Sequence, residues 1–568
     1  MKSDLAPKPE HESGSDLPAY QKILETIRTK YFLSPDGKNI DHLMDMVRFA
    51  VETVLARQGL GPVYPLNEGR PVLSAIAANS RIPDDLTDDP MDALARIPEG
   101  MQGSVKASNP YMVKNIIPLP TLIHLATNLA VSLYMPNAVT GEDAGETLNA
   151  EIACAGAIAN MAGLDPNKSA GIFTFGGTGT NLYAFKIGLH KAFPSHREDG
   201  LQGNAVIIGS MPAHYCHLTG SDWLGIGQKN YIQVQSNLDQ TTRLDQLEEK
   251  CREALKSGKS IACIEAVGGT TSNMAIDDLE AIHNMRNGLV KEFGLDYSPH
   301  IHVDSVLGWV YLNFADYDFH ANPLGFSPGA LTRIRRTTDR IRNIHFADSF
   351  GVDFHKTGYA PYISSMVMVK DKTDFERLLR NRSTMTPLFH DESVYNPGLF
   401  TLETSRSAAN ILATWTSLKA LGKAGHQALV GHSIEMSEAI IKKIGEHKQA
   451  GLYVANQEPF GCDVFIRCYP PGTDPEKAYP LELRGHESLA KNTDYNNKFA
   501  KWLIGVKCEG HDGIALSKSS AAFYTSEGKP VIALRIYPLN PYITTESAGI
   551  LIERLVKAKN EFDASQGY

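Results

Sequence analysis

Short apolar runs alternate with helical patterns between about residue 111 and residue 400, and this alternation limits the possible folds more than any other feature. The runs are Gly171–Phe175, Ala205–Gly209, Ile261–Val267, Ile301–Val303, Ile344–Phe346 and Met366–Val369. Helical patterns such as Asn181–Ala192 and Leu244–Leu255 separate several of them. Buried strands that alternate with helices indicate an α/β fold with a mostly parallel sheet. We assign residues 111–400 to this large domain.

The segments on either side have different patterns. Residues 1–17 are polar and predict a mobile tail. Residues 18–110 predict an N-terminal helical arm, whose apolar stripes suggest a role in dimerisation. After residue 400 a long helical stretch is followed by strand patterns at Leu452–Ala455, Asp463–Cys468, Ile514–Ser517 and Val531–Tyr537 and a last helix at Ser547–Phe562. This order predicts a smaller α+β domain over residues 401–568.

Composition excludes several classes of function. The net charge of −9 gives no basic surface for nucleic acid or anionic lipid. The 7 cysteines are sparse and never spaced as CxxC, which argues against a structural metal site and suits a cytoplasmic protein. The N-terminal residues lack the apolar region of a secretory signal. Leu122–Met135 is shorter than the ~20 residues of a membrane span and predicts a buried helix.

A glycine-rich turn follows the first apolar run and opens a helix, in the order Gly176-Gly177-Thr178-Gly179-Thr180-Asn181. Such a turn lets backbone N–H groups at a helix N-terminus bind a phosphate, with Gly177 and Thr178 as the candidates; a plain tight turn is the alternative. No lysine follows as in a nucleotide P-loop. A dinucleotide-binding motif is incomplete, because Leu182 stands where its last glycine belongs.

Three further residues near strand ends add chemistry to this turn. Asp304 ends a predicted strand, where its carboxylate can hold a protonated ring nitrogen. Lys356 has an amine that can bond an aldehyde, provided that a nearby cation or an apolar pocket depresses its pKa. His214 can stack on a flat ring. Alone, these are a capping aspartate, a surface lysine and a loop histidine; with the turn they describe a site for pyridoxal 5′-phosphate.

With these residues the sequence resembles the group II pyridoxal-phosphate-dependent amino acid decarboxylases, over roughly residues 105–425 and more faintly beyond. The block Asp353-Phe354-His355-Lys356, preceded by Ala347-Asp348-Ser349, is the most specific part. The run from Lys356 to Tyr362 is similar to the longer bacterial branch that includes tyrosine decarboxylases. The resemblance implies the fold type I (aspartate-aminotransferase-like) architecture, with a mostly parallel seven-stranded sheet, and a homodimer with active sites at its interface.

The resemblance also implies a role for each matched residue. Lys356 is the lysine that binds the cofactor aldehyde, Asp304 pairs with the ring nitrogen, and His214 stacks on the ring. The other implied cofactor contacts are Gly177, Thr178, Thr271, Asp353 and His355. Tyr362 matches a tyrosine credited with proton transfer, although a packed core tyrosine is the alternative. Arg406 is either structural or linked to the phosphate.

Some positions depart from the family pattern and leave the substrate open. Ser305-Val306 replaces Ala-Ala, and Thr357 stands where tryptophan is common. We expect α-decarboxylation of an L-amino acid to the amine and CO₂, with an aromatic side chain favoured over an acidic one. An acidic substrate needs a cation in the pocket, for which Arg406 and Lys114 are the candidates.

Other activities remain as alternatives to α-decarboxylation. The same residues suit another pyridoxal-phosphate carbon–carbon lyase or an aldehyde-forming decarboxylase. A dinucleotide-dependent oxidoreductase is the alternative of another class, although no acidic residue ends the strand pattern Ala205–Gly209. A non-catalytic binding protein is disfavoured, because a scaffold needs neither Lys356 nor Asp304.

Overall fold

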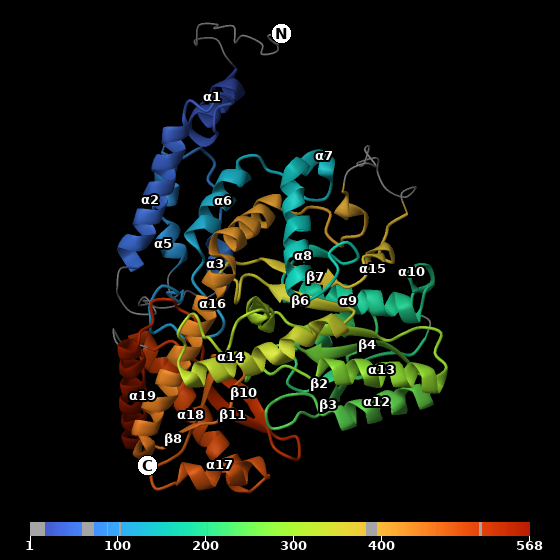
Figure 1. Cartoon of the computed structure of the whole chain (residues 1–568). Coiled ribbons are helices and arrows are strands. Elements are labelled where there is room, and N and C mark those ends of the chain that lie inside the picture. Colours follow the sequence, from blue (N-terminus) through green and yellow to red (C-terminus); the bar gives the residue numbers. More distant parts are fainter. Residues whose placement is uncertain are drawn as a thin grey trace. The chain divides into compact units, whose positions relative to one another are not determined.

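The computed structural model describes residues 18–58, 73–87, 89–101, 104–201, 203–381, 395–509 and 514–568 (Figure 1). Contacts divide the chain into two compact units. The first comprises Met1–Lys106 with Cys508–His511, and the second comprises Ala107–Lys507 with Asp512–Tyr568. The predicted tail, residues 1–17, lies outside the described residues.

The first unit is helical in its described parts. Its helices are α1 (Ala19–Tyr31), α2 (Ile40–Gln58), α3 (Leu73–Asn79), α4 (Pro90–Leu94) and α5 (Ile97–Gly100). The start of α4 follows local rules, since the Asp89 side chain accepts from the Met91 N–H and Pro90 occupies the first turn. The helical character predicted for this arm is present in α1 to α5, and the dimerisation role of the arm stays a prediction.

The second unit contains a seven-stranded sheet in the order β1-β7-β6-β5-β4-β2-β3. Its strands are β1 (Ala170–Thr174), β2 (Ala205–Ser210), β3 (Tyr231–Val234), β4 (Ser260–Val267), β5 (His300–Asp304), β6 (Ser349–Asp353) and β7 (Ser365–Val369). β7 pairs antiparallel with β1 and β6, and the other pairs are parallel. The predicted mostly parallel sheet is confirmed.

Helices cover both faces of this sheet because side chains alternate along each strand. On β2, Ile207 packs in one cluster with Phe185 of α9 (Gly177–Ala192), and Ile208 packs in another with Leu247 of α12 (Leu244–Lys256). Helix α9 runs against β4, β5, β6 and β7. The other helices around this sheet are α6 (Leu122–Ser132), α7 (Gly141–Ala144), α8 (Asn149–Met161), α10 (His196–Asp199), α11 (Cys216–Trp223), α13 (Leu279–Phe293), α14 (Pro328–Ile341) and α15 (Thr373–Glu376).

One strand prediction in this region is wrong, and two strands were not predicted. Ile344–Phe346 lies in a 3₁₀ helix (Arg342–Phe346), and the strand begins three residues later as β6. β6 was hidden because it contains Ser, Gly and Asp; a Cβ at Gly351 would lie 2.5 Å from the Thr180 hydroxyl of α9, so this central position excludes a larger residue. The edge strand β3 was also missed, since its middle residues are partly exposed and only its ends are buried.

A second, four-stranded antiparallel sheet has the order β10-β11-β9-β8. Its elements are β8 (Leu452–Val454), β9 (Val464–Cys468), β10 (Ser517–Tyr524) and β11 (Pro530–Ile536), with α17 (Pro475–Leu483), α18 (Ser488–Glu509) and α19 (Thr545–Gln566) gathered beside them in Figure 1. α16 (Ala408–Glu446), with a kink at Gly422, joins the two sheets. The strand predicted at Ile514–Ser517 begins later in the structure, as β10 at Ser517. The prediction was misplaced because Ile514 and Leu516 are buried although they precede the strand. The predicted boundary at residue 400 stays a prediction, since both sheets belong to one compact unit.

The prediction of a buried helix at Leu122–Met135 is also wrong. α6 forms, but it buries only His124, while Leu122, Tyr134 and Met135 are each more than 80% exposed. His124 Nε2 lies 3.1 Å from Asn410 Oδ1, so the polar side of α6 is the side that faces α16. Among the residues that the structure describes, no helix has the length and apolar character needed to cross a membrane.

Candidate active site

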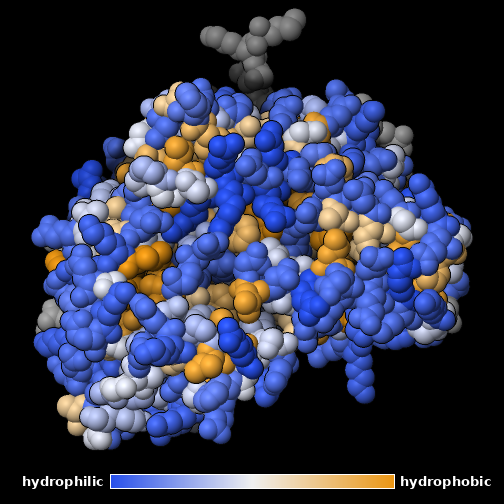
Figure 2. Space-filling model, turned by 60° about the horizontal axis from the view of Figure 1, so that its bottom comes forward, coloured by the Kyte–Doolittle hydropathy of each residue, from blue (hydrophilic) through white to orange (hydrophobic). Residues whose placement is uncertain are grey.

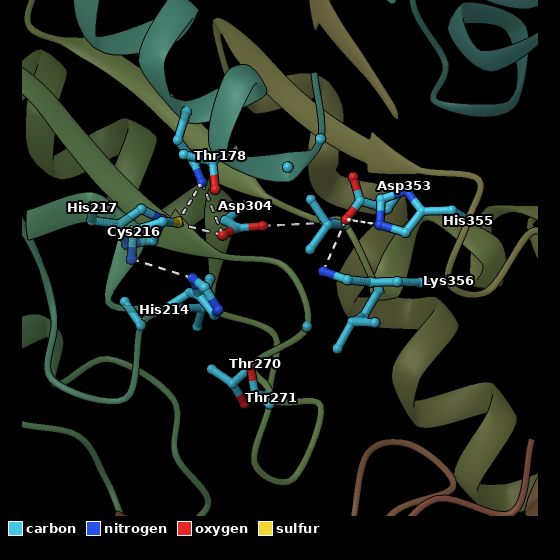
Figure 3. A pocket seen from close by; sticks show the side chains of 18 of the residues that line it. Thr178, His214, Cys216, His217, Thr270, Thr271, Asp304, Asp353, His355 and Lys356 are labelled. Carbon is cyan, nitrogen blue, oxygen red and sulfur yellow. Dashed lines mark hydrogen bonds and ion pairs between the residues drawn. The ribbon is translucent and has the colours of Figure 1, made fainter. Parts of the chain in front are cut away.

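One cavity of about 260 Å³ lies at the carboxyl ends of the strands of the large sheet (Figure 3). Ligands bind at such ends in open α/β sheets, because the loops that follow the strands converge there. Nine of the residues predicted from the sequence line this cavity, namely Gly177, Thr178, His214, Thr271, Asp304, Asp353, His355, Lys356 and Tyr362, whereas the two candidate cations Arg406 and Lys114 do not. The structure thus brings the set together, and the individual roles stay predictions.

The N-terminus of α9 forms one wall of the cavity. Gly176 has φ of +103°, which a residue with a side chain rarely adopts. A Cβ at Gly177 would lie 3.0 Å from Asp353 Oδ2, so the backbone lies against this carboxylate. α9 begins without a side-chain cap, which leaves its first N–H groups for an anion. This wall suits a phosphate group.

Lys356 lies at the end of β6, three residues after Asp353. Its Nζ is 2.8 Å from Asp353 Oδ2, and His355 Nε2 lies 3.5 Å from the same oxygen. Burial would lower the pKa of Lys356, but the Asp353 carboxylate raises it above the ordinary value. The expectation of a lysine with a depressed pKa is therefore wrong for this state, because a carboxylate rather than a cation faces the amine.

Asp304 lies opposite Lys356 and is almost fully buried. Its Oδ2 accepts hydrogen bonds from His217 Nε2 at 3.1 Å and from Asn181 Nδ2 at 3.2 Å. Burial alone would raise the pKa of Asp304, but the hydrogen bond from His217 and the positive charges around it hold that pKa well below its usual range. The carboxylate is thus ionised, and Oδ1, which accepts a long hydrogen bond from the Val306 N–H at 3.5 Å, can accept a second one from a partner in the cavity.

Three buried residues behind Asp304 were missed by the sequence analysis. His217 Nδ1 lies 3.4 Å from Glu265 Oε2, and the Tyr231 hydroxyl donates to the same oxygen at 3.0 Å. The only signal in the sequence was a second histidine three residues after His214. Glu265 was hidden inside an apolar run.

His214 and Thr271 line the cavity on the loops that follow β2 and β4. His214 Nδ1 accepts from the Cys216 N–H at 3.2 Å, which orients its ring. The Tyr537 hydroxyl donates to the Thr271 carbonyl, which fixes the second loop. Both residues are therefore held in place by hydrogen bonds within the protein.

Two alternatives are open for the role of Tyr362 and two for that of Arg406, and the contacts of each side chain distinguish them. Tyr362 is 61% exposed and lies with its ring 4.7 Å from that of His355, so it is not a packed core tyrosine. Arg406 is buried, pairs with Glu151 and donates to the Ala138 and Phe173 carbonyls. It is structural, and it supplies no cation to the cavity.

The donors and acceptors of the cavity fit pyridoxal 5′-phosphate. The N-terminus of α9 suits its phosphate, Asp304 Oδ1 suits a protonated ring nitrogen, and the Lys356 amine suits its aldehyde. A seven-stranded sheet of this order with such a site defines the pyridoxal-phosphate enzymes of fold type I.

Comparisons with known proteins identify the family to which the chain belongs within this class of enzymes. The family model described as the pyridoxal-dependent decarboxylase conserved domain matches residues 82–314 and 326–465. The chain therefore belongs to the pyridoxal-dependent decarboxylase family, and its cofactor is pyridoxal 5′-phosphate.

Individual relatives are distant. The acidic amino acid decarboxylase of Bos taurus is 27% identical over 282 residues, which are 48% of each chain. The L-tyrosine decarboxylase of Enterococcus faecium is 28% identical over 242 residues, 40% of this chain and 38% of the relative. The match thus spans about half of these relatives or less. The crystal structure of mouse CSAD in apo form superimposes with a TM-score of 0.72 at 18% identity, covering 91% of this chain and 98% of that chain, which supports the fold.

Proposed function

We propose that the protein is a pyridoxal-phosphate-dependent carboxy-lyase that converts an L-amino acid to its amine and CO₂. The observation that carries the proposal is the placement of Lys356 and Asp304 in one cavity, beside an uncapped helix N-terminus, in a chain of the decarboxylase family.

When bound, the cofactor supplies a ring that takes up the electron pair left by a broken bond at the substrate Cα. Lys356 would provide the amine that holds the cofactor aldehyde until a substrate amine takes its place. Asp304 keeps a proton on the ring nitrogen through a charge-assisted hydrogen bond. His214 would stack on the ring, and the N-terminus of α9 with His355 would hold the phosphate.

The cavity favours loss of CO₂ because part of its lining offers the substrate carboxylate no charged or hydrogen-bonding partner. Val306, Leu307 and Ile363 give part of the cavity an apolar lining. A substrate carboxylate held against such a lining is destabilised relative to CO₂, which carries no charge. We infer that this lining lies where the bond to the carboxylate stands perpendicular to the ring.

An assay of amine and CO₂ release across the amino acids, with added pyridoxal phosphate, tests the proposal. Stoichiometric amine and CO₂ from one substrate support it. Carbon–carbon cleavage without CO₂ indicates another lyase, and an aldehyde product indicates the aldehyde-forming alternative. Hydride transfer to an added dinucleotide would place the protein in a different class.

For the substrate, we propose an aromatic L-amino acid. Among the described residues that line the cavity, Lys356 is the one lysine or arginine, and Arg406 is bound to Glu151. A buried acidic side chain without a cation is costly, whereas Tyr362 and Ile363 offer contact to an aromatic ring. Release of CO₂ from tyrosine, phenylalanine or tryptophan supports this choice, and release only from glutamate or aspartate contradicts it.

Tyr362→Phe is expected to slow turnover about a hundredfold, because we propose that its hydroxyl donates the proton to Cα. Binding of pyridoxal phosphate should not change, since phenylalanine keeps the ring contact with His355. Tyr359→Phe is the control: its buried hydroxyl donates to the Leu539 carbonyl and does not line the cavity. Equal turnover by the two variants, measured as initial rates of amine formation, would remove Tyr362 from the chemistry.

We also propose a homodimer whose interface covers α6. Leu122, Ile123, Leu125 and Leu129 of this helix are all exposed, and Tyr134 and Met135 follow directly. Figure 2 shows, by contrast, a face on which hydrophobic side chains stand in separate patches among hydrophilic ones. A second copy of the chain is the partner that fits an apolar helix next to an active-site domain.

Leu125→Asp is expected to give monomers and to lower activity at least about tenfold, because a carboxylate in an apolar interface has no partner. Sedimentation velocity and the amine assay measure the two effects. Leu238→Asp is the matched control, an exposed leucine outside α6. A Leu125→Asp protein that remains dimeric, or a fully active monomer, contradicts the proposed interface.

For the location, we propose the cytoplasm. The six cysteines whose side chains the structure describes are all free and buried. Free thiols of this kind suit a reducing compartment. Imaging of a tagged protein in its native cell tests the location.

A further inference from the structure

A chain of buried polar groups runs from Asp304 along the wall of the cavity, through His217 and Glu265, to Tyr231 in the sheet. His217 of α11 stands between two carboxylates, with Nε2 3.1 Å from Asp304 Oδ2 and Nδ1 3.4 Å from Glu265 Oε2. Tyr231 of β3 donates to that Glu265 oxygen at 3.0 Å and lies 3.4 Å from His217 Nδ1. His217 and Glu265 are completely buried, so water does not screen these contacts.

The charges in this chain depend on one another. Burial lowers the pKa of His217, but Glu265, Cys216 and Asp304 raise it well above its ordinary value. Burial raises the pKa of Glu265 to about 7, while His217 and Tyr231 oppose that rise. His217 thus carries a proton, and Glu265 changes its charge near neutral pH.

Other titratable groups also face this chain. Cys216 lies next to His217 on α11, and burial would raise the pKa of its thiol, whereas His217 lowers it to about 6. His302 of β5 is kept neutral by burial, which lowers its pKa to about 3. Asp277, beyond the end of β4, repels the Glu265 charge.

We propose that His217 and Glu265 are positioning residues that aim the Asp304 carboxylate at the cofactor ring nitrogen and set how firmly that nitrogen holds its proton. This inference rests on the proposed function. His217 fixes Oδ2 of Asp304, while Oδ1 has only the long contact from the Val306 N–H and can accept a hydrogen bond from the ring. The positive charge of His217 would offset the negative charge of Asp304. The Glu265 carboxylate neutralises the charge of His217 and so removes this effect. The ring nitrogen therefore meets the full negative charge of Asp304 only when Glu265 is ionised.

The sign of the pH dependence follows. Below about pH 7 Glu265 is protonated, the His217 charge is uncompensated, and the ring nitrogen holds its proton less firmly. Wild-type protein should therefore show a rise in kcat/KM near pH 7, with a matching change in the visible absorbance of the bound cofactor. Glu265→Gln should lack both, and its kcat/KM at pH 8 should be about tenfold lower than that of wild type.

Two further variants separate this role from a structural one. Tyr231→Phe removes a hydrogen bond that stabilises the Glu265 carboxylate, so the rise should move to higher pH by about half a unit to one unit. Asp277→Asn keeps the Glu265 hydrogen bonds but removes a charge that repels the Glu265 carboxylate, so the rise should move in the opposite direction, to lower pH.

The experiment records cofactor absorbance and kcat/KM from pH 5.5 to 9 for the four holoproteins, at about half-unit steps over the range in which perturbed carboxyl groups titrate. A rise that persists unchanged in Glu265→Gln, or a shift to higher pH in Asp277→Asn, overturns the inference. If Glu265→Gln fails to fold, an unshifted Tyr231→Phe profile overturns it instead. A wild-type protein without cofactor absorbance or CO₂ release would instead refute the proposed function, so the two failures are distinct.

Discussion

Lys356→Ala is expected to lower turnover at least about a thousandfold, because no other group can take the place of its amine. Lys356 is the one lysine among the described residues that line the cavity, and Asp353 holds its Nζ at 2.8 Å. Pyridoxal phosphate should still bind weakly, since the N-terminus of α9 and Asp304 keep their contacts. Reduction with borohydride should fix the cofactor to the Lys356 peptide in wild type and to none in the variant.

Two control variants distinguish loss of the amine from loss of charge. Lys356→Arg keeps a cation beside Asp353 but cannot form the covalent bond, so it should be as inactive as Lys356→Ala. Lys370→Ala removes an exposed lysine whose Nζ donates to the His345 carbonyl, and it should keep full activity. Label recovered on any other lysine of the wild-type protein would refute the assignment.

The sequence predicted the main sheet because most of its strands are fully buried and therefore read as apolar runs. The prediction failed at strands whose residue types are determined by contacts other than burial in the sheet. β6 carries Gly351 against α9 and ends in Asp353, so its pattern is broken by contacts that only the fold reveals. The neighbouring Ile344 gave an apolar signal but is buried from a 3₁₀ helix.

The cavity residues could be predicted because their types and their places after strand ends carry the chemistry directly. His217 and Glu265 could not, because each acts through Asp304, and their contact joins α11 to β4. Arg406 is the opposite case. Its charge suggested contact with a ligand, but its guanidinium is paired with the buried Glu151. Side chains that support a site can be identified only from the residues that they contact, and a single sequence does not show these contacts.

Asp304→Asn is expected to lower kcat about a hundredfold to a thousandfold while the fold persists. Asparagine has nearly the same shape, and its carbonyl oxygen can still accept from His217 Nε2 and Asn181 Nδ2. An amide carries no negative charge, so it no longer favours a protonated ring nitrogen; each unit lost from that nitrogen's pKa reduces the protonated fraction up to about tenfold.

The same substitution can be tested by restoring the charge on the cofactor. An analogue methylated at the ring nitrogen carries a fixed positive charge and does not depend on Asp304 for it. Asp304→Asn loaded with this analogue should therefore regain much of the lost kcat, whereas Lys356→Ala should not. The thermal unfolding midpoint of the apo variant checks the fold, with Asp277→Asn as a buried carboxylate outside the cavity. If Asp304→Asn turned over at the wild-type rate with ordinary cofactor, the carboxylate would have no part in holding the ring proton, and the reason for placing it opposite Lys356 would have to be sought in substrate binding.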